Sequence, residues 1–97
     1  MTIFGAEIPF VEHCGIEEVG TVDGNTRTRL RMAPQPFQLN NIGIVHGGAI
    51  CTLLDVAMGS TCRVSLGKPV MTLDMQVAFV SPGRGVLLAE GRILKAG

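Results

Sequence analysis

Asp55 is the first residue in this sequence whose position suggests chemistry. It is the only acidic residue between Asp23 and Asp74, and the other residues of 53–57 are leucine, valine and alanine. A carboxylate that is removed from water is destabilising unless it is paired, and a positioned carboxylate can act as a general base. The alternative is a structural aspartate bonded to the backbone or to a serine or threonine.

A His-Gly-Gly sequence at residues 46–48 is the second candidate. Two glycines at the start of a helix let another molecule approach the backbone closely. The first N–H groups of a helix point outward at the positive end of its dipole, and such groups can hold the oxyanion that develops on a reacting carbonyl. The alternative is that the glycines only fit a tight turn and that His46 is an ordinary buried histidine.

The spacing of the two candidates restricts how they could act together. Nine residues separate His46 from Asp55, which on a helix corresponds to about 13.5 Å of rise and about 900° of rotation. One carbonyl group cannot contact both within a single chain. If both serve one site, the second residue must come from another subunit, so the sequence predicts an active site across a subunit interface.

The first half of the chain predicts a short helix followed by two strands. Residues 6–13 favour a helix, in which Pro9 is tolerated only in the first turn. Residues 15–19 favour a strand, and Asp23-Gly24 is typical of a hairpin turn. Residues 26–32 alternate, with three arginines on one side and Thr, Leu and Met on the other, which indicates a half-buried strand.

The second half predicts one long apolar helix and two further strands. Residues 47–63 are apolar on almost every side, which is typical of a helix surrounded by protein. A membrane span is less favoured because a carboxylate lies near its middle. Residues 70–80 and 86–95 favour strands. We therefore expect an α+β fold in which an antiparallel sheet wraps around one central helix.

Length, charge and cysteine content narrow the classes of protein. Ninety-seven residues suffice for a single domain, residues 1–97. Eight acidic and eight basic residues cancel, but residues 1–23 contain five acids and no Lys or Arg. The basic excess of the remainder suits an anionic small molecule or a solvated surface, whereas the absence of a basic run disfavours nucleic acid. Three cysteines without CxxC spacing, and no secretory signal, favour the cytoplasm.

Several segments together resemble a known family. These are the sequences NNIGIVHGG at 40–48, LLDVA at 53–57, VMTLDM at 70–75 and FVSP at 79–82. In combination they resemble the hotdog-fold acyl-CoA thioesterases of the phenylacetate-degradation (PaaI-like) type, over residues 9–95. The resemblance implies hydrolysis of an acyl-CoA, with an aromatic or medium-chain acyl group, by a homodimer or homotetramer without metal or cofactor. Because members continue beyond residue 97, it also implies that C-terminal strands are missing here.

The resemblance implies roles for individual residues. Asp55 matches the catalytic carboxylate, which acts as nucleophile or as general base, and Thr72 matches the residue that orients it or the water. The N–H of Gly47 matches the donor to the thioester carbonyl, and Gly48 lies beside the substrate. Asn40 matches a side chain that polarises that carbonyl, while His46 shapes the turn.

Two other functions use the same scaffold. A non-catalytic acyl-CoA-binding domain would keep the groove but would not need a carboxylate beside the thioester. A hotdog dehydratase would pair a histidine and an acid differently and ranks third. The residues that could bind the phosphates of coenzyme A are Arg63, Lys68, Arg84, Arg92 and Lys95.

Overall fold

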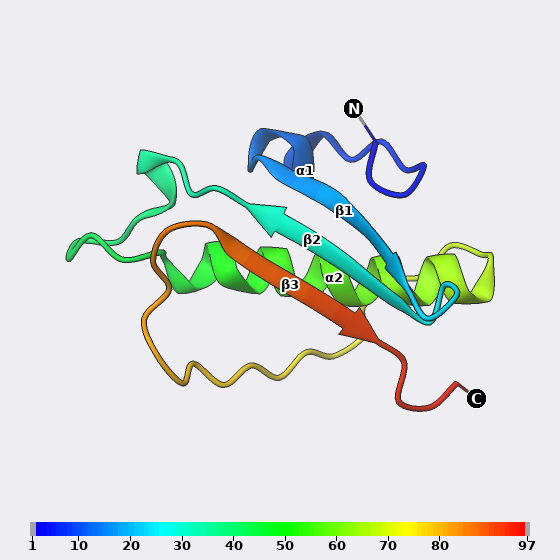
Figure 1. Ribbon diagram of the computed structural model, residues 1–97. Helices are drawn as coiled ribbons and strands as arrows, with labels where there is room; N and C mark the ends of the chain where they lie inside the picture. Colours follow the sequence, from blue (N-terminus) through cyan, green and yellow to red (C-terminus); the bar gives the residue numbers. More distant parts are fainter. Residues whose placement is uncertain (1, 97) are drawn as a thin grey trace.

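A three-stranded antiparallel sheet lies against one long helix in the computed structural model, which describes residues 2–96. In the sheet the strands follow the order β1-β2-β3. The long helix lies between β2 and β3 in the sequence. Figure 1 shows all three strands crossing the same side of the helix. The elements are α1 (Pro9–His13), β1 (Ile16–Val22), β2 (Arg27–Met32), a 3-10 turn (Pro36–Gln38), α2 (Gly47–Leu66) and β3 (Leu87–Arg92).

The first hairpin forms as its sequence predicts. Asp23, Gly24 and Asn25 all have positive φ angles, of 53°, 57° and 54°, and these residue types tolerate the left-handed region best. The alternation of β2 is also confirmed, because Thr28, Leu30 and Met32 are completely buried. The intervening arginines face the outer side of the sheet.

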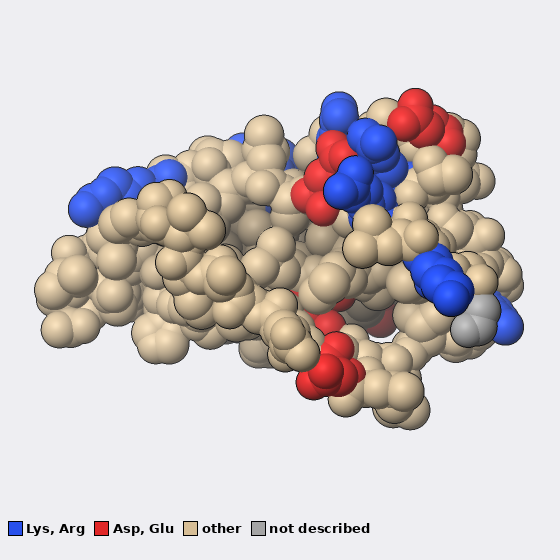
Figure 2. Space-filling model, turned by 90° about the horizontal axis from the view of Figure 1, so that it is seen from below, with Lys and Arg blue, Asp and Glu red and all other residues tan. Residues whose placement is uncertain are grey.

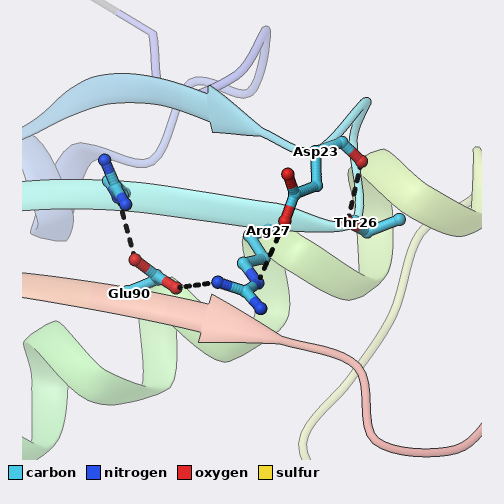
Figure 3. A network of polar contacts seen from close by, with 5 residues as sticks. Asp23, Thr26, Arg27 and Glu90 are labelled. Carbon is cyan, nitrogen blue, oxygen red and sulfur yellow. Dashed lines mark hydrogen bonds and ion pairs between the residues drawn. The ribbon is translucent and has the colours of Figure 1, made fainter.

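Ion pairs cover this outer face of the sheet (Figure 3). Glu90 on β3 contacts Arg29 at 2.8 Å and Arg27 at 3.3 Å, and Arg27 also lies 3.6 Å from Asp23. The hydrogen bond and charge of Arg29, with a smaller effect of Arg27, hold the pKa of Glu90 below its ordinary value. The ion pairs of the charged Glu90 therefore stabilise the fold at pH values above the ordinary carboxyl pKa. This stabilisation is lost as the pH falls through the lowered pKa of Glu90. Solvent exposure keeps it small.

Helix α2 has a defined start, end and buried face. His46 caps its N-terminus, and Gly67 ends it with a left-handed φ of 69° and an N–H bonded to the carbonyl of Arg63. The helix thus extends three residues beyond the predicted end. Its buried residues, at helical spacing along one side, are Leu53, Ala57, Ser60 and Thr61. That side packs against β2 and β3.

The prediction that protein surrounds this helix is wrong for the single chain. Only the side toward the sheet is fully buried, and Met58 on another side remains 43% exposed. The physical reason is that the three strands lie on one side of α2 (Figure 1). The apolar residues elsewhere on the helix are therefore left partly accessible to solvent.

The strand predicted at residues 70–80 is absent. This segment is extended and runs back alongside α2 (Figure 1), but within residues 2–96 it joins no ladder. Alternating apolar residues favour a strand only if a neighbouring backbone accepts its hydrogen bonds, and β3 pairs with β2 instead. Leu73 and Val80 are consequently 93% exposed. The last predicted strand does form, at Leu87–Arg92.

The sheet and α2 approach each other closely at a pair of buried hydroxyl groups. The Oγ1 atoms of Thr28 and Thr61 are 2.7 Å apart, and Thr61 donates to the carbonyl of Ala57 at 2.8 Å. Gly91 on β3 lies against the same point, where an added Cβ would overlap both Thr61 Oγ1 and the Ala57 carbonyl. Glycine is therefore required here by close packing of backbone on backbone.

Replacing Gly91 by alanine should destabilise the fold. Because the overlapped atoms include a helix carbonyl that cannot rotate away, we expect Gly91→Ala to lower the free energy of unfolding by about 1–3 kcal/mol. Urea unfolding followed by circular dichroism measures this change. The matched control is Gly59→Ala in α2, whose Cβ would meet nothing within 4 Å and which should leave stability unchanged or higher. Equal effects of the two substitutions would contradict the packing explanation.

Candidate active site

The structure brings two of the predicted site residues together. The hydroxyl of Thr72 donates a hydrogen bond of 2.6 Å to Oδ1 of Asp55. Asp55 lies on a face of α2 turned away from the sheet, and Thr72 lies on the extended segment that follows the helix. Asp55 is only partly buried, so its expected removal from water is incomplete in the single chain. A hydroxyl donor at this distance orients the carboxylate.

A pocket of about 460 Å³ opens beside this pair. Its floor is one stripe of α2 that includes Thr52, Val56 and Gly59, and its opposite wall comes from the N-terminal segment, with Ile8 and Phe10. Apart from the carboxylate, nearby hydroxyl groups and the guanidinium of Arg63, these walls are apolar. The volume falls within the range of small-molecule sites, about 300–1,000 Å³.

The His-Gly-Gly turn presents one free backbone donor. Nδ1 of His46 accepts the N–H of Gly48 at 2.9 Å, so the donor of Gly48 is used within the turn. An accepting Nδ1 places the proton of the neutral imidazole on Nε2. Across residues 2–96, the N–H of Gly47 has no acceptor and lies at the positive end of the helix dipole. His46 itself is exposed, so the alternative of a buried histidine is wrong.

Asn40 holds the loop before α2 and lies near Gly47. Its Oδ1 accepts the N–H groups of Ile42 at 3.0 Å and Ile44 at 3.2 Å. Its NH2 group has no partner in the described part of the chain and remains able to donate. Asn40 and Gly47 line a second pocket of about 380 Å³ together with Phe79, whose ring packs against Gly47.

The two pairs of candidate residues do not share a pocket. Asp55 and Thr72 line the first one, Asn40 and Gly47 line the second, and the residues around the two pockets do not overlap. This separation agrees with the helix geometry, in which about 13.5 Å of rise lies between residues 46 and 55. Within residues 2–96, the structure therefore does not bring all four residues to one pocket.

Arg63 has a structural role that its sequence position did not indicate. Its Nη1 and Nη2 donate to the carbonyls of Phe4 and Ile3 at 2.8 and 2.7 Å. The guanidinium thus fastens the N-terminal turn to α2, although it had been a candidate for binding coenzyme A. Figure 2 shows a mostly uncharged face on which Lys and Arg side chains lie in separate places and acidic side chains border a hollow.

Sequence reasoning missed parts of the first pocket. Gly59 lies one helical turn after Asp55 on the same stripe, so the spacing alone could have identified it. The wall formed by Ile8 and Phe10 carried no such signal, because it depends on a contact between segments far apart in the chain.

Comparison with families and curated proteins gives two matches. A family described as "Domain of unknown function (DUF4442)" matches residues 1–96. A protein of Halobacterium salinarum named "Putative esterase" is 35% identical over 91 residues, which cover 86% of this chain and 58% of the relative. The chain therefore spans little more than half of that relative's length.

Solved structures resemble the chain more completely. A conserved protein of Pseudomonas aeruginosa is 28% identical, with a TM-score of 0.85 over 94% of this chain and 74% of that one. A protein from the thioesterase superfamily is 26% identical, with a TM-score of 0.83 over 93% and 69%. PaaI of Escherichia coli, from the phenylacetic acid degradation operon, is 22% identical and shares the fold, with a TM-score of 0.83 over 94% and 65%. The chain therefore belongs to the DUF4442 family, and its fold is the hotdog fold found in PaaI and the thioesterase superfamily.

Proposed function

We propose that this chain forms the subunit of an acyl-CoA thioesterase, which hydrolyses a thioester to a free acid and coenzyme A. The observation that carries the proposal is the Asp55–Thr72 hydrogen bond at the edge of an apolar pocket. The esterase name of the halobacterial relative and the structural likeness to the thioesterase superfamily support thioester hydrolysis. An aromatic or medium-chain acyl group suits the apolar walls.

The four candidate residues have separate roles in the proposed reaction. The N–H of Gly47 and the NH2 group of Asn40 donate to the thioester oxygen and stabilise the negative charge that develops on it. Asp55 either attacks the carbonyl carbon or removes a proton from an attacking water. Collapse of the tetrahedral intermediate breaks the C–S bond, and the thiolate of coenzyme A leaves and takes up a proton. In the general-base route this proton is the one that Asp55 removed from water, and the free acid forms directly. In the nucleophilic route the acyl group is first bound to Asp55 as an anhydride, which water then hydrolyses to the free acid. Thr72 orients the carboxylate through its hydroxyl group.

A second copy of the chain completes the site. Gly47 and Asn40 of one subunit hold the carbonyl, while Asp55 and Thr72 of the other attack it, in a homodimer or a homotetramer. The partly exposed apolar side of α2 and the unpaired 70–80 segment supply surface for such an interface. The three free thiols, Cys14, Cys51 and Cys62, suit a cytoplasmic protein.

A non-catalytic acyl-CoA-binding domain is the second candidate. One observation is compatible with it: Oδ1 of Asp55 accepts the hydroxyl of Thr72, as it would in an aspartate with a purely structural role. Such a domain would bind acyl-CoA and release no coenzyme A.

Replacing Asp55 by asparagine separates these two functions. Asp55→Asn keeps the size of the side chain and an Oδ1 for Thr72, but it removes the base or nucleophile. We expect release of free coenzyme A from a panel of acyl-CoAs to fall by about 10²–10⁴-fold. The control is Asp74→Asn, an exposed carboxylate that should change little. A folded parent chain that binds acyl-CoA without releasing coenzyme A would support the binding domain instead.

Thr72 should act on turnover rather than on substrate binding. Loss of its hydrogen bond in Thr72→Val should reduce kcat about 10- to 100-fold, because hydrogen bonds to charged groups contribute roughly 1.5–3 kcal/mol. KM should change little. Thr72→Ser retains the hydroxyl and should restore most of kcat. A loss in Thr72→Ser without a loss in Thr72→Val would mean that the methyl group, and not the hydroxyl, matters at this position.

Mixed subunits test whether the site crosses an interface. Asn40→Asp keeps the Oδ atoms that hold its loop but removes the NH2 donor, so this variant and Asp55→Asn should each be inactive alone. Unfolding and refolding the two together should restore activity, because one site of each mixed dimer then contains native Asn40 and native Asp55. If the mixture stays inactive while mixed dimers form, all four residues do not belong to a shared site.

A further inference from the structure

Gly59 occupies a position where glycine has no structural explanation. It lies inside the 20-residue helix α2, where glycine is less favourable than alanine. Its φ is not in the left-handed region, and an added Cβ would meet nothing within 4 Å. Gly91 differs in this respect, because the space that its side chain would occupy is already filled by atoms of α2. The empty space beside Gly59 therefore belongs to a cavity and not to packed protein.

That cavity is the pocket beside Asp55. Gly59 follows Asp55 by four residues, so the two lie one above the other on the same face of α2. Val56 lies between them on this face, and Val70 borders the pocket from the following segment. The lining is polar at Asp55 and Thr72 and also includes Thr52, Ser60 and Arg63, whose guanidinium is bonded to backbone carbonyls. The other side chains of the lining are apolar. An acyl group whose carbonyl is near Asp55 would lie against this apolar lining, along the helix.

The opposite wall is held in place. Arg63 binds the carbonyls of Ile3 and Phe4, and the carboxylate of Glu18 accepts the N–H of Phe4 at 2.8 Å. These bonds anchor the N-terminal turn that leads directly into the wall residues Ile8 and Phe10. Because this wall is fixed at its base, the space between it and α2 depends on the side chains of the helix face.

We propose that Gly59 determines the size of acyl group that the pocket accepts. The absence of a side chain one turn beyond Asp55 leaves room for a long or bulky apolar acyl group, and any larger residue there would shorten the pocket. This inference rests on the proposed function, because it takes the acyl part of an acyl-CoA as the occupant. It makes Gly59 a determinant of specificity and assigns it no part in the chemical step.

Binding of S-alkyl coenzyme A thioethers tests the role of Gly59 without any hydrolysis. These compounds lack the carbonyl, so affinity measured by calorimetry does not depend on activity. In the parent chain, affinity should rise from the methyl to the octyl thioether. Gly59→Leu should weaken binding of the octyl compound by about tenfold or more and leave the methyl compound unchanged, with Gly59→Ala intermediate. Circular dichroism verifies the fold, which alanine should maintain or stabilise.

Met58→Phe is the matched control, because it enlarges a neighbouring helix residue that does not line this pocket. It should leave the dependence on alkyl length unchanged. A loss in Gly59→Leu that is equal for all lengths, or no loss at all, would overturn the proposal. So would a parent chain with no preference for length. Length-dependent binding by a chain that releases no coenzyme A would instead refute the thioesterase while retaining Gly59 as the size determinant.

Discussion

The close contact of the sheet with α2 determines where the candidate residues point. Thr28, Thr61 and the Ala57 carbonyl form a buried polar cluster, and Gly91 allows β3 to approach it. A hydrogen-bonded cluster in an apolar interior fixes the rotation of a helix more strictly than apolar contacts do, because each partner left unbonded would be destabilising. With this face on the sheet, Asp55 and Gly59 necessarily face the other side, toward the N-terminal segment.

The apolar residues of α2 lie on three differently placed sides of the helix, which the sequence alone does not separate. One side is apolar because it packs on the sheet, as at Leu53 and Ala57. The pocket face is apolar at Val56 and unobstructed at Gly59, where the structure leaves a cavity. Exposed Met58 belongs to neither set. The apolar residues of α2 therefore comprise a side packed on the sheet, a side that lines a pocket and an uncovered side, and the helix is not simply enclosed within one chain.

Local patterns predicted most of the fold, and long-range pairing was the part that failed. The alternation of β2, the Asp23-Gly24 turn and the start of α2 depend on residues close in sequence, and all three are confirmed. Whether residues 70–80 form a strand depends on a partner that no local pattern specifies. The same distinction applies to the site: Gly59 could be found from its spacing to Asp55, whereas the Ile8–Phe10 wall could not.

The backbone N–H of Gly47 and the carboxylate of Asp55 lie far apart on α2 because each needs a different part of the helix. A backbone N–H without an intrahelical partner exists only in the first turn of a helix, so Gly47 must lie at the end of α2. The carboxylate of Asp55 lies beside the first pocket, whose floor is the middle of the same helix and which takes the acyl group in the proposed function. One straight helix cannot satisfy both requirements at a single carbonyl, but two helices from two copies can. In this arrangement a subunit interface would be part of the catalytic design, and the apolar side of α2 would contribute to it.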